Sequence, residues 1–116
     1  MTLESDLKAA LLLAAPRLLP SLRLFRRQVM RVRLEDPDRT FAVGIKGQAD
    51  LWGVWRGGRH IELELKNATG RLTTHQVAWQ AFCRSWGVPH LVLRGRDGES
   101  TEETVRRWII EIQAVP

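Results

Sequence analysis

The segment His60–Lys66 constrains the fold most, because its side chains alternate between apolar and charged along the whole segment. Alternate side chains of a β-strand share one face, so the pattern predicts a strand with one apolar and one charged face. The apolar face carries Ile61, Leu63 and Leu65, and the charged face carries Glu62, Glu64 and Lys66. The apolar face can pack in a core, whereas the charged face must meet water, a metal ion or a ligand.

An acidic residue precedes the neighbouring strand. The segment Leu51–Trp55 predicts that strand, and Arg56–Arg59 predicts a hairpin turn in which Gly57 and Gly58 supply positive φ. Asp50 lies directly before the strand. Taken singly, Asp50 is typical of an aspartate that caps a turn, and Glu-x-Lys is typical of a solvated strand face. Together, two carboxylates beside a lysine favour a hard-metal site that handles phosphate.

The surrounding sequence sharpens this pattern. Asp50 lies in GQADLWG (47–53), the acid-x-lysine triplet is ELK (64–66), and GRLTTHQVAW follows at 70–79. This order resembles the VRR-NUC family of the PD-(D/E)XK nuclease superfamily, and the resemblance extends over residues 4–93. The family often has proline before its lone aspartate, where this chain has Ala49. That residue shapes the turn and is not a ligand.

The resemblance implies an α/β fold with a restriction-endonuclease-like PD-(D/E)XK core, in which helices flank a mixed central sheet in the order αβββαβα. The length suits a single domain that spans residues 1–116. Periodicity and turn residues predict helices at 2–19, 74–86 and 99–113, an extended segment at 22–34, a turn at 35–38, and strands at 41–43, 51–55, 60–66 and 88–94.

Phosphodiester hydrolysis requires a divalent ion, oxygen ligands that hold it, and a cation that stabilises developing negative charge. By the resemblance, Asp50, Glu64 and the backbone carbonyl of Leu65 are the metal ligands, and Lys66 is the catalytic cation. Oxygen ligands favour Mg²⁺ or Mn²⁺ over zinc, which prefers nitrogen and sulfur.

Three further residues each have two interpretations. Gln76 matches the family's glutamine near the metal and the phosphate, but Thr73-x-x-Gln76 is also a capping box. Glu4 resembles the acid that the first helix contributes to many such sites, or it pairs with Lys8 on the surface. Glu62 either serves as an additional ligand or orients one, or it pairs with an arginine across the strands.

The net charge of +5 favours an acidic partner, most often nucleic acid. The expected DNA contacts are Arg27, Arg31, Arg56, Arg59, Arg71 and His75. Among these, Arg56, Arg59 and Arg71 are expected to flank the site, whereas the arginines before it also suit a solvated strand edge. Trp52 and Trp55 have odd spacing, so we expect one of them in the core. The other is free to stack on an unpaired base or to fill a dimer interface.

We therefore predict an Mg²⁺- or Mn²⁺-dependent endonuclease for structured DNA, a homodimeric enzyme like a Holliday-junction resolvase in replication, recombination or repair. Two alternatives stay open: a flap, single-strand or nicking nuclease with the same site, and a non-catalytic DNA-binding module. Cys83 is the only cysteine, and no apolar run approaches the ~20 residues that span a bilayer. We expect no membrane partner and a cytoplasmic location in a bacterial or phage-infected cell.

Overall fold

A computed structural model gives the structure of this protein and describes residues 4–27, 30–33, 40–43 and 45–116. Its helices are α1 (Glu4–Leu18), α2 (Thr74–Ser85) and α3 (Thr101–Gln113). Its strands are β1 (Leu22–Arg26), β2 (Met30–Arg33), β3 (Thr40–Val43), β4 (Leu51–Trp55), β5 (His60–Lys66) and β6 (His90–Arg94).

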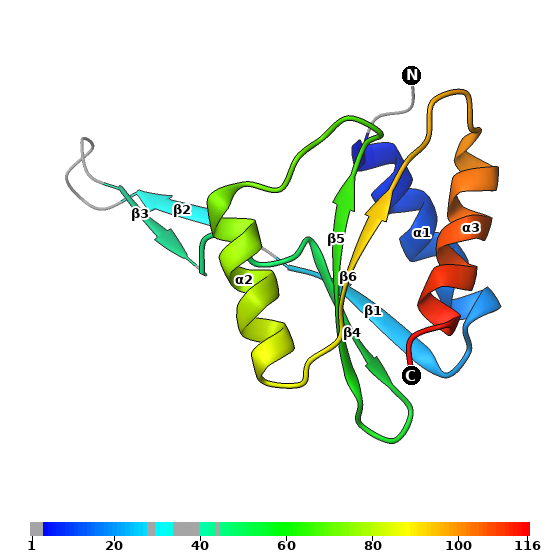
Figure 1. Ribbon diagram of the computed structural model, residues 1–116, viewed down its shortest axis with the longest axis horizontal. Coiled ribbons are helices and arrows are strands. Elements are labelled where there is room, and N and C mark those ends of the chain that lie inside the picture. The colour runs from blue at the N-terminus through cyan, green and yellow to red at the C-terminus, as the bar shows by residue number, and fades with distance from the viewer. Residues whose placement is uncertain (1–3, 28–29, 34–39, 44) are drawn as a thin grey trace.

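Four strands form the central mixed sheet in the order β1-β4-β5-β6. The first two pairings are antiparallel, and β5 pairs with β6 in parallel. A parallel pair requires a crossover connection, which α2 supplies. With α1 before these strands and α3 after them, the chain has the expected α/β order αβββαβα (Figure 1).

The extended segment expected at 22–34 contains, in its described part, two strands that belong to different sheets. Strand β1 ends at Arg26, and β2 begins at Met30 and pairs with β3 in a separate two-stranded sheet. The reason is the length of β4, because Arg26 lies opposite its first residue, Leu51. Beyond that point β4 offers β1 no ladder partner. The turn expected at 35–38 lies outside the described residues, as do residues 2 and 3 of the first predicted helix.

Two element boundaries also differ from the prediction at 88–94 and 99–113. Strand β6 begins at His90 because the amide of Val88 bonds back to the Cys83 carbonyl and so belongs to the end of α2. Helix α3 begins at Thr101 because the Ser100 side chain caps it by accepting from the Glu103 amide.

The helices cover the two faces of the sheet unequally. Helices α1 and α3 lie on one face and α2 lies on the other (Figure 1). The first face carries the core that the alternation of β5 predicts, with Leu11, Leu51, Ile61, Leu63, Leu65, Leu93, Trp108 and Ile112 fully buried. Trp55 packs against this core, as expected for one of the two spaced tryptophans. No helix in the described part of the chain is long and apolar enough to cross a bilayer.

Candidate functional site

The register of the β4–β5 hairpin brings the two predicted metal-binding carboxylates together. Leu51 lies opposite Leu63, so the next residue outward on each strand places Asp50 beside Glu64. Residues opposite each other across an antiparallel pair point to the same face. The Leu65 amide donates to Asp50 Oδ2 at 2.9 Å, and the Asp50 carbonyl accepts from the Arg27 amide at 3.0 Å. Asp50 is therefore held by both neighbouring segments.

The same geometry directs the Leu65 carbonyl toward Asp50. The N–H and C=O groups of one strand residue point to the same side of the strand. Since the Leu65 amide reaches Asp50, its carbonyl also faces the β4 side, where the ladder has ended at the Leu51–Leu63 pair. This orientation is compatible with the role of third oxygen ligand that the resemblance implies for the Leu65 carbonyl.

Glu64 is buried and only partly satisfied. Its side chain is 2% exposed, Oε1 accepts from Gln76 Nε2 at 2.8 Å, and Lys66 Nζ lies 3.9 Å from Oε1. Oε2 is buried and has no hydrogen-bond partner among the described residues. Burial, the charge of the neighbouring Asp50 carboxylate and a hydrogen bond to Asp50 that forms only when Glu64 carries a proton raise the pKa of Glu64 to about 8, although Lys66 opposes this. The site is therefore short of positive charge.

This shortage fits a divalent cation. Asp50 and Glu64 supply hard carboxylate oxygens, and one of these oxygens lacks a partner. No group of three or more His, Cys, Asp or Glu side chains suited to a metal occurs in the described ranges. Mg²⁺ commonly binds through one or two carboxylates, with waters and substrate phosphate completing the shell. The residues present fit such an ion.

Gln76 forms the expected capping box and also contacts Glu64, because a carboxamide has two ends. Its Oε1 accepts from the Thr73 amide at 2.9 Å, and the Thr73 hydroxyl accepts from the Gln76 amide at 3.2 Å, which completes the capping box. Its Nε2 meanwhile donates to Glu64. The cap thus orients a site residue at the N-terminus of α2, which itself favours phosphate.

Glu4 lies near the same carboxylates. It is half-buried at the start of α1, a helix that packs against β5. Burial and the Asp50 carboxylate raise the pKa of Glu4, whereas Lys66 and Lys8 lower it. Helix α1 therefore brings Glu4 within electrostatic reach of the site as well as of Lys8.

Glu62 takes the second of its two interpretations, a pairing with an arginine. Its side chain is 1% exposed. The carboxylate accepts hydrogen bonds from both terminal guanidinium nitrogens of Arg27 and, at 3.0 Å, from Trp79 Nε1, and it also contacts His60 Nε2. Burial by itself raises the pKa of Glu62, but the hydrogen bonds from Arg27 and His60 together hold that pKa below its ordinary value. Of the three environments expected for the charged face of β5, water is therefore ruled out for both glutamates, since both are buried on the face that α2 covers.

The expected DNA contacts are spread over three places. Arg71 and His75 are exposed beyond Lys66, between β5 and the first turn of α2. Arg56 and Arg59 are exposed in the β4–β5 turn, at the other end of β5, about 20 Å from Lys66 by strand rise. The expectation that these two arginines flank the site is therefore corrected, because the length of the strand separates the turn from the site.

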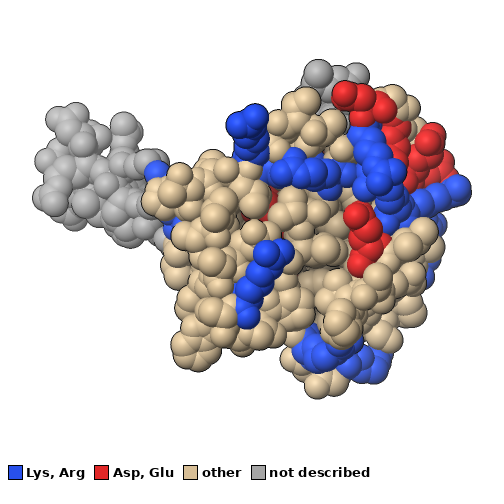
Figure 2. Space-filling model, in the orientation of Figure 1, with Lys and Arg blue, Asp and Glu red and all other residues tan. Residues whose placement is uncertain are grey.

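The remaining two expected contacts differ in exposure. Arg27 is 16% exposed and engaged with Glu62, and Arg31 lies on β2, where the side chains are outside the described part. On the face that Figure 2 shows, a band of Lys and Arg side chains crosses the end of the sheet at which β5 stops and α2 begins.

Sequence reasoning missed Trp79 as a member of the site's surroundings. Trp79 follows Gln76 by three residues, so both side chains lie on one face of α2. Gln76 reaches Glu64 and Trp79 reaches Glu62 in the same way. The matching spacing of the two glutamates on β5 is the signal that could have found it.

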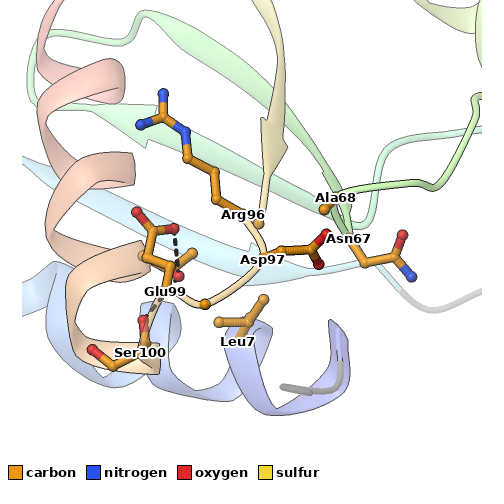
Figure 3. A pocket seen from close by; sticks show the side chains of 10 residues that line it. Leu7, Asn67, Ala68, Arg96, Asp97, Glu99 and Ser100 are labelled. Carbon is orange, nitrogen blue, oxygen red and sulfur yellow. Dashed lines mark hydrogen bonds between the residues drawn. The ribbon is translucent and has the colours of Figure 1, made fainter.

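A cavity of about 520 Å³ lies next to the site without containing it (Figure 3). It is lined by Leu7 of α1, by the Asn67–Ala68 segment that follows Lys66, and by residues 95–100. Of its two carboxylates, Asp97 is exposed, and Glu99 is already hydrogen-bonded to Thr104 at 2.7 Å and to Arg107. Among the described residues, the buried carboxylate oxygen without a partner lies instead at Glu64.

Comparison with known proteins gives a local similarity. No family model matches the chain, and no curated protein matches it. Two solved structures of paFAN1, bound to 5′-flap DNA with a gap and a flap of 1 or 2 nucleotides, are 34% and 33% identical to it, each with a TM-score of 0.40. Each similarity covers 43% of this chain and 9% of that chain. The chain thus spans about a tenth of the length of paFAN1.

Proposed function

We propose that this domain is a divalent-metal-dependent nuclease that hydrolyses phosphodiester bonds in DNA. The observation that carries the proposal is the buried Glu64 carboxylate, which lies beside Asp50 with one oxygen unpartnered and with Lys66 Nζ 3.9 Å from the other. A purely structural ion pair would leave no such deficit of positive charge. The net charge of +5 is compatible with DNA as the partner.

Each site residue then has a defined task. Asp50, Glu64 and the Leu65 carbonyl would hold Mg²⁺ or Mn²⁺, which when bound polarises the phosphate and acidifies a water. Lys66 places a positive charge against the charge that develops on phosphorus or on the attacking hydroxide. Gln76 holds the Glu64 carboxylate in orientation through the 2.8 Å hydrogen bond.

The test is cleavage of labelled DNA in Mg²⁺, Mn²⁺ or EDTA, with a four-way junction, a flap, a single strand and a plain duplex as substrates. Lys66→Ala is compared with Lys46→Ala, which removes the same charge from an exposed lysine outside the site. Single-turnover rates at saturating protein separate chemistry from DNA binding. We expect metal-dependent cleavage that Lys66→Ala abolishes and Lys46→Ala retains. No cleavage of any substrate would refute the proposal.

For the substrate, our first proposal is a branched junction cut by a homodimer. Symmetric cleavage of two strands requires two sites related by a two-fold axis, which a homodimer supplies. Light scattering coupled to gel filtration is the measurement, and a monomer at working concentration would refute this part. The nuclease proposal itself would survive that result.

A flap or single-strand nuclease is the second candidate, and exposed aromatic side chains favour it. Phe82 and Trp86 of the α2 region are 49% and 74% exposed. The Phe82 ring lies 5.4 Å from Trp79 and 5.9 Å from Trp86, centroid to centroid. Such a row suits stacking of unpaired bases. Cleavage of flaps but not of junctions would select this candidate.

The third candidate is a DNA-binding module without catalysis. It predicts DNA binding without cleavage, and no change in thermal stability on adding Mg²⁺ or Mn²⁺. Because the site around the Glu64 carboxylate is short of positive charge, we expect instead that either ion binds there and raises the midpoint of thermal unfolding.

A further inference from the structure

The guanidinium of Arg27 joins two segments that are far apart in sequence. Its two terminal nitrogens hydrogen-bond the Glu62 carboxylate of β5, and Nη1 also donates to the Ala49 carbonyl at 3.3 Å. The Arg27 backbone amide donates to the Asp50 carbonyl at 3.0 Å. Arg27 thus contacts the carbonyl of Ala49, which precedes Asp50, and the carbonyl of Asp50 itself. It anchors both carbonyls to the buried Glu62 carboxylate.

We propose that Arg27 is a positioning residue that sets the location of the Asp50 carboxylate relative to Glu64. This inference rests on the proposed function of those carboxylates as metal ligands. Asp50 lies one residue beyond the last paired residue of β4, Leu51, so the sheet ladder alone does not fix it. The contacts from Arg27 continue the restraint of the ladder past its end.

The buried partner makes this restraint stiff. Glu62 is 1% exposed and is held by Trp79 of α2 as well as by Arg27, whose guanidinium lies 5.8 Å from the Trp79 ring centroid. The planar fork of arginine can bond a carboxylate with two nitrogens and a carbonyl with a spare hydrogen, whereas a lysine ammonium is a point charge. The same acid therefore ties the Asp50 segment and α2, which carries Gln76, to β5.

A direct contact between Arg27 and phosphate is the competing role. The Arg27 side chain is 16% exposed, and its terminal nitrogens are already committed to Glu62 and Ala49. A phosphate contact would require breaking a pairing with a buried carboxylate, which costs several kcal/mol. These contacts therefore favour a role in which the Arg27 guanidinium bonds groups of the protein itself over one in which it contacts phosphate.

The experiment measures Mn²⁺ affinity by titration calorimetry, which does not depend on cleavage. The variants are Arg27→Met, the conservative Arg27→Lys, and the double variant Arg27→Met with Glu62→Gln. The matched control is Arg26→Met, which removes the same charge from the neighbouring exposed residue. DNA affinity in EDTA as a function of salt, and single-turnover cleavage rates, are measured in parallel.

We expect Arg27→Met to weaken Mn²⁺ binding by roughly 10–100-fold, the range for residues that orient a metal ligand, and to slow cleavage similarly. Arg27→Lys recovers part of this, and Arg26→Met leaves Mn²⁺ affinity unchanged. The double variant removes the unpaired buried charge and so recovers stability, but it still lacks the Ala49 contact and stays weak in Mn²⁺ binding. It decides the matter if Arg27→Met alone does not fold.

Two results would overturn the positioning role. Wild-type Mn²⁺ affinity in the double variant would mean that Arg27 only neutralises Glu62. Unchanged Mn²⁺ affinity in Arg27→Met, with a larger loss of DNA affinity and of salt dependence than in Arg26→Met, would assign it to phosphate. If the wild type binds Mn²⁺ but cuts no DNA, the proposed function fails while the Mn²⁺ affinities still decide the role of Arg27. A wild type that binds no Mn²⁺ overturns both.

Discussion

Substituting Glu64 by glutamine should stabilise the metal-free protein while abolishing its metal binding. Glu64 is 2% exposed, and burial together with the Asp50 carboxylate raises its pKa to about 8. Glutamine keeps the shape and can still accept a hydrogen bond from Gln76, but it does not ionise. The substitution therefore removes an electrostatic cost that the metal ion would otherwise offset.

The size and pH dependence of the effect follow from the raised pKa. A carboxyl whose folded pKa lies above its unfolded value stabilises the fold at low pH, and this stability is lost as the pH rises through the folded pKa. Between its ordinary value of 4.5 and about 8, the loss amounts to about 5 kcal/mol. At pH 7, part-way between these two values, the stability lost relative to pH 4.5 is about 3 kcal/mol. The gain from Glu64→Gln is thus near zero at pH 4.5 and grows with pH.

The assay is urea unfolding in EDTA at several pH values between 4 and 9, with Glu62→Gln as the matched control. Glu62 is as buried as Glu64 and lies on the same strand, but its pKa is lowered. Its substitution should destabilise the protein above pH 4.5, which is the opposite sign. In saturating Mn²⁺ the wild type and Glu62→Gln, which both keep the ligand set, should gain stability, whereas Glu64→Gln should not. A Glu64→Gln variant no more stable than the wild type at pH 8 in EDTA would refute the reasoning.

Three other substitutions test separate parts of the structure. Gly47→Ala should destabilise by about 1–3 kcal/mol from its positive φ alone, and by more because the new Cβ would lie 2.3 Å from the His75 carbonyl oxygen; chemical denaturation measures it. Lys66→Met should abolish cleavage and shift Mn²⁺ binding to higher pH, because Lys66 lowers the pKa of Glu64; calorimetric titrations across pH measure it. The hydrogen bond from Arg107 lowers the pKa of Glu99 to about 2, so ionised Glu99 stabilises the wild type, and this stability is lost as the pH falls from 4.5 to about 2. Arg107→Met should lack this contribution and its pH dependence, which acid unfolding curves measure.

Each of the three has a control within the chain. Gly57→Ala imposes a similar strain at φ 101° in open space, so an equal loss in both glycine variants would contradict the clash at Gly47. Lys8→Met should leave cleavage intact, because Lys8 lies outside the ligand set. Arg106→Met breaks a fully exposed i,i+4 pair with Glu102 and should leave the acid unfolding curve unchanged. An acid curve altered equally by Arg106→Met and Arg107→Met would refute the assignment.

The proximity of Asp50 to Glu64 could be predicted from the sequence because local rules link the two residues. The turn at Gly57 and Gly58, both at positive φ, starts a register that pairs residues outward in order until Asp50 meets Glu64. The capping box at Thr73 and Gln76 is likewise local, and both of its predicted bonds are present. Arg56 and Arg59 were misplaced because they are near β5 in sequence but lie at the end of the strand opposite to Lys66.

Other features depend on contacts that no local pattern specifies. The pairing of Arg27 with Glu62 spans 35 residues and needs β1 to lie beside β4, with α2 over the same face. The end of β1 at Arg26 depends on where β4 begins. Neither the separation in sequence nor the periodicity of either segment indicates these partners.

The sequence by itself therefore determined the strand faces, the hairpin register, the helix cap and the identity of the carboxylates and the lysine, because each is decided within a few residues by backbone geometry. Only the tertiary structure decided the environment of those groups. Packing α2 over the charged face of β5 buried both glutamates, paired Glu62 with Arg27 and left one oxygen of Glu64 unsatisfied. Burial turns the same side chain from a solvated acid into one that requires a cation, because the cost of an unpaired charge rises steeply away from water.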